Sequence, residues 1–116
     1  MMKVTISWWD LSQSPQTIES LRDYLIDEGI APWERIAGLV LKFWISDPAT
    51  NRWGAVMLWD SAEAAKGPMP PNRALELIGH PPEIRLVADM EALVGRLQIN
   101  GRADEGLAWT PAKVAS

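Results

Sequence analysis

The sequence predicts an α+β protein with the ferredoxin-like order β-α-β-β-α-β and an antiparallel sheet. Strand-like and helix-like segments follow one another in this order along the chain. The expected strands are also apolar on both faces, whereas a sheet with one solvated face alternates cleanly between apolar and polar residues. Because both helices of this arrangement lie on one face, we expect the sheet of a second subunit to cover the other. Two subunits would then form a dimeric α/β barrel.

The first half of the chain predicts a strand, a helix and a second strand. Residues 2–9 alternate β-branched and polar side chains, which is typical of a strand. A helix follows, with Ser14 as the expected N-cap, Pro15 in the first helical position and Gly29 as the C-terminal stop. Its apolar residues recur at helical spacing, so this helix should lie on the sheet. The second strand is expected over 36–46.

A turn over 47–52 leads into a third strand over 53–59. A short helix follows, with Asp60 or Ser61 as its N-cap. The glycine and prolines of residues 67–71 interrupt this helical region.

Asn72 is the expected N-cap of a second helical piece that runs to Gly79. The fourth strand is expected over 83–89, followed by a short helix or an irregular end over 90–99. We therefore expect one domain over residues 1–100 and a mobile C-terminal tail over 101–116, where the composition is small and polar.

Composition excludes several classes of protein. The chain of 116 residues has no cysteine and one histidine, so disulfides, thiolate metal sites and multi-histidine metal sites are not expected. Acidic residues exceed basic residues by 15 to 11, which argues against binding nucleic acid. No apolar run is long enough to span a membrane, and the N-terminus does not have the layout of a signal peptide. We expect a cytoplasmic, metal-free protein.

The aromatic composition is unusual, with seven Trp but one Tyr and one Phe. Most Trp residues in small domains are packing residues, so Trp could simply fill the core here. Alternatively, several Trp side chains could line a flat, apolar pocket for a planar ligand. Composition alone favours the first reading.

Three motifs carry a resemblance to a known family. They are Gly38-x-x-x-Lys42-x-Trp44, Gly54-x-x-x-Leu58-Trp59-Asp60 and the strand from Glu83 to Asp89. On these motifs the chain resembles the YdhR-like mono-oxygenase family of dimeric α/β-barrel proteins, over about residues 2–98. Family members usually have a second glycine and an aromatic residue where this chain has Ala55 and Met57. The prolines of 67–71 also break a helix that is continuous in relatives, which indicates a divergent member.

The resemblance implies cofactor-independent mono-oxygenation of a small aromatic or polyketide-like compound, hence no cofactor. Such a site must bind a flat ring, take or stabilise a proton and exclude water. Lys42 could stabilise an oxyanion, His80 could act as the base, and Tyr24 could donate to a substrate oxygen. Each residue also has a structural interpretation. Lys42 lies in an apolar strand, where its pKa would be lowered by burial or it would pair with an acid such as Asp60; structurally, it could instead lie at the barrel seam in an ion pair across the dimer. His80 could merely meet the dipole and solvent at a helix end, and Tyr24 could be half-buried packing.

The remaining candidates are substrate-binding residues. Four Trp side chains would supply flat walls, Met57 would reshape the pocket, and Arg73 could reach an anionic group. A non-catalytic ligand-binding or dimerisation module remains an alternative, as does an isomerase or cyclase that works by proton transfer in the same pocket. The four Trp residues are Trp8, Trp44, Trp53 and Trp59.

Overall fold

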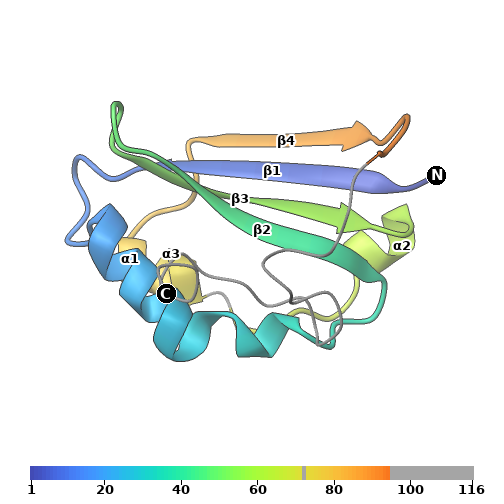
Figure 1. The fold of residues 1–116 in the computed structure, drawn as a ribbon, viewed down its shortest axis with the longest axis horizontal. Helices are drawn as coiled ribbons and strands as arrows, with labels where there is room; N and C mark the ends of the chain where they lie inside the picture. The colour runs from blue at the N-terminus through green and yellow to red at the C-terminus, as the bar shows by residue number, and fades with distance from the viewer. Residues whose placement is uncertain (72, 95–116) are drawn as a thin grey trace.

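A computed structural model describes residues 1–71 and 73–94 of the chain. In this part of the chain, antiparallel strands form one sheet in the order β2-β3-β1-β4 (Figure 1). This is the strand order of a ferredoxin-like fold, with β1 and β3 in the centre, so the predicted α+β class is confirmed. The strands are β1 (Lys3–Asp10), β2 (Leu39–Asp47), β3 (Arg52–Trp59) and β4 (Ile84–Asp89).

The helices between the strands are short. The first helix, α1 (Ile18–Tyr24), continues as a π-helical turn, η1 (Leu25–Gly29), and a 3₁₀ turn, η2 (Ala31–Trp33). The crossover from β3 to β4 contains α2 (Ala62–Ala65) and α3 (Arg73–Ile78). The predicted break between the last two is confirmed.

The predicted start of the first helix is wrong by three residues, since Thr17 and not Ser14 is its N-cap. Thr17 Oγ1 accepts from the Ser20 backbone N–H at 3.0 Å, and Ser20 Oγ accepts from the Thr17 N–H at 2.8 Å. This reciprocal pair satisfies two N–H groups at once. Ser14 instead donates a hydrogen bond from its hydroxyl to the Ile78 carbonyl at 2.9 Å. This bond joins the loop between β1 and α1 to the end of α3.

The core lies where α1 and α3 pack on one face of the sheet, which we call the helix-covered face (Figure 1). Trp9 of β1 and Trp53 of β3 are register partners on this face. Both are buried, together with one leucine before α1 and apolar residues from each helix. The cluster contains Trp9, Leu11, Ile18, Leu21, Trp53 and Ile78.

The second strand begins at Leu39 and not at residue 36, because Gly38 has a φ of +79°. Its carbonyl accepts from the Asp60 N–H at 2.9 Å, and a Cβ at this position would overlap the side chain of Ala64. Glycine therefore allows both the left-handed backbone and the close approach of α2. At the start of α2, Ser61 is the N-cap as predicted.

The predicted C-terminal elements lie partly outside the described residues. Residues 90–94 have no regular structure, whereas 95–99 and the expected tail over 101–116 are not described. The expected Asn72 N-cap also falls outside.

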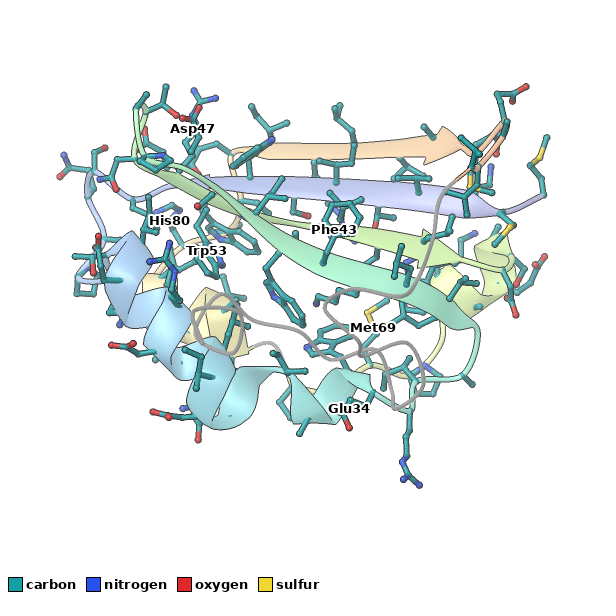
Figure 2. The ribbon with its side chains drawn as sticks, in the orientation of Figure 1. Glu34, Phe43, Asp47, Trp53, Met69 and His80 are labelled. Carbon is teal, nitrogen blue, oxygen red and sulfur yellow. The ribbon has the colours of Figure 1, made fainter. Side chains whose placement is uncertain are left out.

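The opposite face of the sheet, which we call the open face, is apolar as predicted. On β1, Val4, Ile6 and Trp8 lie on this face, while Thr5 and Ser7 lie on the helix-covered face and are buried. The distribution is the reverse of a sheet that turns its polar residues to water. Phe43, which lies on β2 (Figure 2), is 45% exposed. Leu86 on β4 is 55% exposed.

Gly54 shows how tightly side chains cover the centre of the open face. A Cβ on Gly54 would come to 3.0 Å from the Trp8 ring and 3.2 Å from the side chain of Ile45. Glycine at this position therefore lets the indole of Trp8 lie directly over β3.

Candidate functional site

Lys42 is the central residue of the candidate site. It lies on the helix-covered face of β2, in register with Met57 of β3. Its Nζ is 3.1 Å from the centroid of the Trp33 ring and 4.9 Å from that of Trp44. Trp44 follows two residues later on the same face of β2. Trp33 belongs to η2, which places its ring against the same amine. The amine is therefore held by two indoles.

Burial lowers the pKa of Lys42 from its ordinary value of 10.5 to about 7. The cause of this lowering is the loss of hydration, which disfavours the ammonium form, whereas the two aromatic ring faces attract an ammonium ion. Among the described residues, no ion pair includes Lys42. Within the described part of the chain Lys42 does not pair with Asp60. An ion pair across a dimer stays a prediction. At neutral pH about half of the amines with such a pKa are unprotonated.

Two buried polar atoms lie in the same region of the helix-covered face. Thr5 of β1 and Lys42 of β2 flank Met57 in one row across the sheet, and Trp59 follows Met57 by two residues. Thr5 Oγ1 and Trp59 Nε1 are buried, and neither has a hydrogen-bond partner in the described part of the chain. Buried polar groups without a hydrogen-bond partner are uncommon and lower the stability of the fold. They therefore indicate a place where a polar ligand atom could supply the missing hydrogen bond.

Next to this row is a cleft of about 350 Å³, a size that suits a small molecule. Trp33 takes part in both regions, because it lines the cleft and covers Lys42. Two residues predicted from the sequence, Tyr24 and Arg73, line the same cleft. The lining residues are Tyr24, Glu28, Pro32, Trp33, Pro70, Pro71 and Arg73.

The surroundings of Tyr24 in the cleft favour its protonated form. Burial, followed by the nearby carboxylate of Glu28, raises the pKa of the Tyr24 phenol. A neutral phenol donates a hydrogen bond. Arg73 lies 3.8 Å from a Glu28 oxygen and donates to Glu76 at 2.7 Å, so its guanidinium is already engaged with two partly exposed carboxylates.

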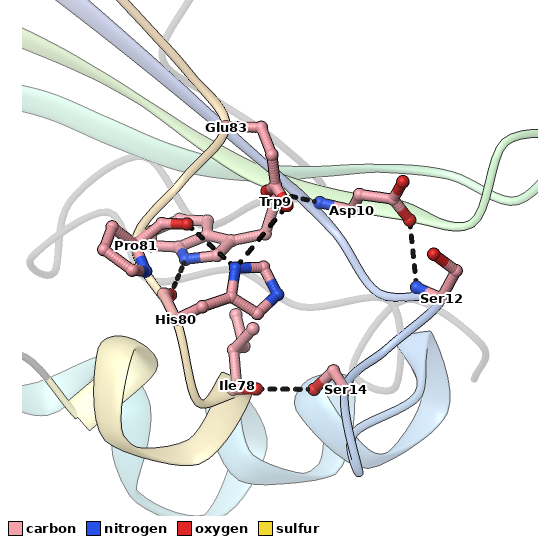
Figure 3. A network of polar contacts seen from close by, with 8 residues as sticks. All are labelled: Trp9, Asp10, Ser12, Ser14, Ile78, His80, Pro81 and Glu83. Carbon is pink, nitrogen blue, oxygen red and sulfur yellow. Dashed lines mark hydrogen bonds and ion pairs between the residues drawn. The ribbon is translucent and has the colours of Figure 1, made fainter.

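His80 lies in a different region, beside Trp9 of the core (Figure 3). Its backbone carbonyl accepts from Trp9 Nε1 at 2.9 Å. Its Nδ1 lies 2.9 Å from the Pro81 carbonyl and 3.5 Å from Glu83 Oε2. Trp9 pairs with Trp53, which precedes Met57 by four residues, or roughly 13 Å along β3. His80 therefore lies just after the end of α3, and its backbone carbonyl is bonded to a core tryptophan.

The four predicted Trp walls do not form one pocket. Trp8 lies on the open face, over Gly54. Trp53 belongs to the core cluster, and Trp44 packs against that cluster while approaching Lys42. Trp59 is fully buried. The structure therefore brings Trp44 and Trp59 to the Lys42 region, together with Met57.

Sequence reasoning missed Trp33, which makes the shorter of the two Lys42–indole contacts. It also missed the unpaired hydroxyl of Thr5. The sequence Ala31-Pro32-Trp33 after a helix could have indicated a turn that projects an aromatic ring toward the sheet.

No cluster of three or more potential metal ligands occurs within residues 1–71 and 73–94. Over the same residues, the helices are too short or too polar to cross a membrane.

Comparison with known proteins supports the class of fold. No family model matches the chain, and no curated protein matches it either. The chain is similar to a solved crystal structure, the "putative Antibiotic biosynthesis monooxygenase from Chloroflexus aurantiacus J-10-fl". The TM-score is 0.60 at 18% identity, over 82% of this chain and 98% of the other. At this identity the likeness shows a shared ferredoxin-like α+β fold, of the kind found in a protein named as an antibiotic biosynthesis monooxygenase.

Proposed function

We propose that the protein is a cofactor-independent mono-oxygenase acting on a small aromatic or polyketide-like compound, and a divergent member of the YdhR-like family. The observation that carries the proposal is the amine of Lys42, held between Trp33 and Trp44 without a carboxylate partner among the described residues. The named activity of the structural neighbour supports the same reaction class.

In this mechanism the substrate supplies the electrons and Lys42 handles the proton. The unprotonated amine takes a proton from an acidic phenol or methylene group of the substrate. The ammonium that forms then stabilises the anion beside it, in apolar surroundings that strengthen the attraction. The electron-rich anion reduces O₂: a CH₂ group and O₂ become a C=O group and H₂O, with one oxygen atom in each product.

Binding of a flat ring is assigned to the indoles and the unpaired polar atoms. An aromatic substrate stacks on Trp33 or Trp44. The Thr5 hydroxyl and the Trp59 N–H, which are buried and have no partner among the described residues, are assigned to substrate oxygens that enter this region. Tyr24 donates to a substrate oxygen at the cleft, and Arg73 attracts an anionic substituent there. His80 has no role in this mechanism.

Oxygen consumption tests the proposal. Purified, chelator-treated protein is given a panel of oxidisable polycyclic phenols and anthrones, and uptake of O₂ and formation of quinone are followed. We expect protein-dependent uptake that Lys42→Met reduces at least about 100-fold, as for loss of a general base. Uptake that is unchanged in Lys42→Met would overturn the assignment of Lys42.

The same experiment separates the alternatives. Binding without uptake, seen as quenching of Trp fluorescence, would indicate a non-catalytic ligand-binding module. A product formed without O₂ uptake would indicate an isomerase or cyclase that uses Lys42 as its base.

We also propose that the open faces of two subunits pack together in a homodimer. The support is the exposed apolar side chains of β2 and β4, Phe43 and Leu86, beside an apolar row on β1. Light scattering should give twice the chain mass of 12.9 kDa. Phe43→Asp should halve that mass, whereas Val87→Asp, on the helix-covered face and 64% exposed, should not. A monomeric wild-type protein would overturn this part of the proposal.

The cytoplasmic location expected from the sequence stays a prediction.

A further inference from the structure

The cleft beside the Lys42 row has two walls, which come from different parts of the chain. The end of α1 with η1 and η2 forms one wall and contributes Tyr24, Glu28 and Trp33. The segment that leads into α3 forms the other and contributes Pro71 and Arg73. Of the ion pairs among the described residues, only that between Glu28 and Arg73 joins the two walls. Both partners line the cleft, so a ligand that fills the cleft meets this pair.

The ion pair between Glu28 and Arg73 is loose. Arg73 Nη1 donates a hydrogen bond to Glu76 at 2.7 Å, whereas Arg73 Nη2 lies 3.8 Å from Glu28 Oε1. The second distance is too long for a hydrogen bond. The side chains of Arg73 and Glu28 are also 49% and 62% exposed, and ion pairs between exposed groups contribute little to stability. Glu28 can therefore leave Arg73 with little loss of stability.

We propose that the cleft selects flat aromatic compounds that carry a carboxylate, and that Glu28 holds the place of this carboxylate in the free protein. The ligand carboxylate replaces Glu28 beside Arg73 Nη2, and the Glu28 side chain turns to solvent. An incoming ligand is not tied to the backbone of η1, so it can approach the guanidinium to the distance of a charge-assisted hydrogen bond. The inference rests on the proposed function, because it names the substrate class of the proposed mono-oxygenase.

The other groups of the cleft suit an aromatic acid. Tyr24 is protonated at neutral pH, since burial and then Glu28 raise the pKa of its phenol, and a protonated phenol can donate to a carboxylate oxygen. The indole of Trp33 offers an aromatic surface to a flat ring. The remaining lining residues are prolines, which add apolar surface without backbone N–H groups. Hydrogen-bond donors for the carboxylate and apolar surface for the ring therefore meet in one cleft.

Glu28 makes the cleft sensitive to the charge of a ligand. Its carboxylate repels a second anion and partly offsets the charge of Arg73. A neutral aromatic compound leaves the Glu28–Arg73 pair in place, whereas an aromatic carboxylate must displace it. Loss of the Glu28 charge should therefore strengthen the binding of aromatic carboxylates and leave the binding of neutral analogues unchanged. The opposite occupant, an aromatic ammonium ion paired with Glu28, predicts the reverse effect.

Equilibrium binding of three probes with the same ring system tests the proposal. The full-length protein is titrated by calorimetry at pH 7 with 2-naphthoate, the neutral 2-naphthamide and the cationic 2-naphthylmethylammonium. We expect 2-naphthoate to bind at least about fivefold more tightly than 2-naphthamide, because of its hydrogen bonds to Arg73. The preference should decrease in about 0.5 M salt, since the charges of the cleft are partly exposed to solvent.

Substitutions in the cleft assign the preference to particular side chains. Glu28→Gln should raise the affinity for 2-naphthoate about three- to tenfold and leave that for 2-naphthamide within about twofold. Arg73→Gln should remove the preference, and Trp33→Ala should weaken the binding of both probes alike. The matched control is Glu63→Gln, which removes the same charge from an exposed residue of α2 outside the cleft. It should change neither affinity by more than about twofold.

Three results would overturn the proposal. The first is binding of 2-naphthoate to Glu28→Gln that is no tighter than that of 2-naphthamide, including no binding at all. The second is an equal effect of Glu28→Gln and Glu63→Gln. The third is tighter binding of the ammonium probe than of 2-naphthoate to the wild-type protein, lost in Glu28→Gln, which would make Glu28 the anchor of a cation.

A carboxylate preference that is seen only in Glu28→Gln supports the proposal, with Glu28 as the barrier in the wild-type protein. Because binding of these probes needs neither turnover nor O₂, its result is independent of the oxygen-uptake assay.

Discussion

The helix-covered face of the sheet has two ends that contain the same residue type in opposite roles. At the core end, Trp9 and Trp53 are buried against α1 and α3, and the Trp9 N–H donates to the His80 carbonyl. At the Lys42 end, Trp33 and Trp44 lie against an amine that makes no ion pair among the described residues. Indoles at the first end complete a packed cluster, whereas those at the second lie against an amine that forms no ion pair in the described part of the chain.

The difference indicates that the core end stabilises the fold and that the Lys42 end is the candidate site. Packing with satisfied hydrogen bonds stabilises the fold, and every polar group left unpaired inside it subtracts from that stability. Functional sites commonly contain such locally unfavourable groups, and the remainder of the structure compensates. The two ends can therefore be separated by substitutions that affect stability at one end and ligand chemistry at the other.

The largest expected effect comes from removing an indole at the core end. Trp53→Ala should lower the free energy of unfolding by about 3–5 kcal/mol, because it removes a 94% buried ring from the cluster. Trp33→Ala removes a partly exposed ring and should cost less than about 1.5 kcal/mol. Urea denaturation of both variants measures the difference. Equal losses would show that the two ends are not distinct.

The next effect is a pH dependence that belongs to the Lys42 end. Between pH 7 and 10.5 the unfolded chain holds a proton on Lys42 that the folded protein has released. The free energy of unfolding should therefore rise with pH in this window, by about 2 kcal/mol between pH 7 and pH 9, and stay level below it. In Lys42→Met this rise should be absent. Denaturation of both proteins at pH 6, 7, 8 and 9 provides the comparison.

The contrast between the two ends also explains how much could be predicted from the sequence. Strand alternation and turn residues report local geometry, so the sheet, the broken second crossover and the apolar open face were predicted. The position of Ser14 outside the helix was not, because Thr17 and Ser20 form a better reciprocal cap three residues later. Local patterns could not choose between two possible N-cap residues three positions apart.

The site was harder to predict than the fold, since it depends on contacts between distant segments. Lys42 stood out as a lysine in an apolar strand, and the structure places it among aromatic rings. Trp33 was missed because nothing in its local sequence shows that η2 turns it toward β2. Trp8 and Trp9 are neighbours in sequence, yet they lie on opposite faces of the sheet. Trp8 therefore cannot line a pocket on the helix-covered face together with the other Trp residues.

Smaller changes in the free energy of unfolding are expected for two threonines, and the two changes have opposite signs. Thr5→Val replaces a buried hydroxyl that has no partner among the described residues, so stability should rise by about 1 kcal/mol. Thr17→Val removes the reciprocal cap of α1 and should cost about 1 kcal/mol. Thermal denaturation measures both. If Thr5 serves a ligand, Thr5→Val should also weaken ligand binding, whereas Thr17→Val should not.

The smallest effect is expected at His80, whose imidazole lies at the core end of the sheet. Substitution distinguishes a catalytic imidazole from one that takes no part in the reaction. A catalytic base would be lost in His80→Gln, and oxygen uptake would fall about 100-fold or more. The structure places the imidazole against Pro81 and Glu83, roughly four residues along the sheet from the row of Lys42. The bond that Trp9 makes is to the backbone carbonyl of His80, which the substitution retains. We therefore expect uptake within about twofold of wild type and a stability change below about 0.5 kcal/mol, as for an ordinary surface substitution. A large loss of uptake in a folded His80→Gln protein would move the reaction centre from the Lys42 end to the core end.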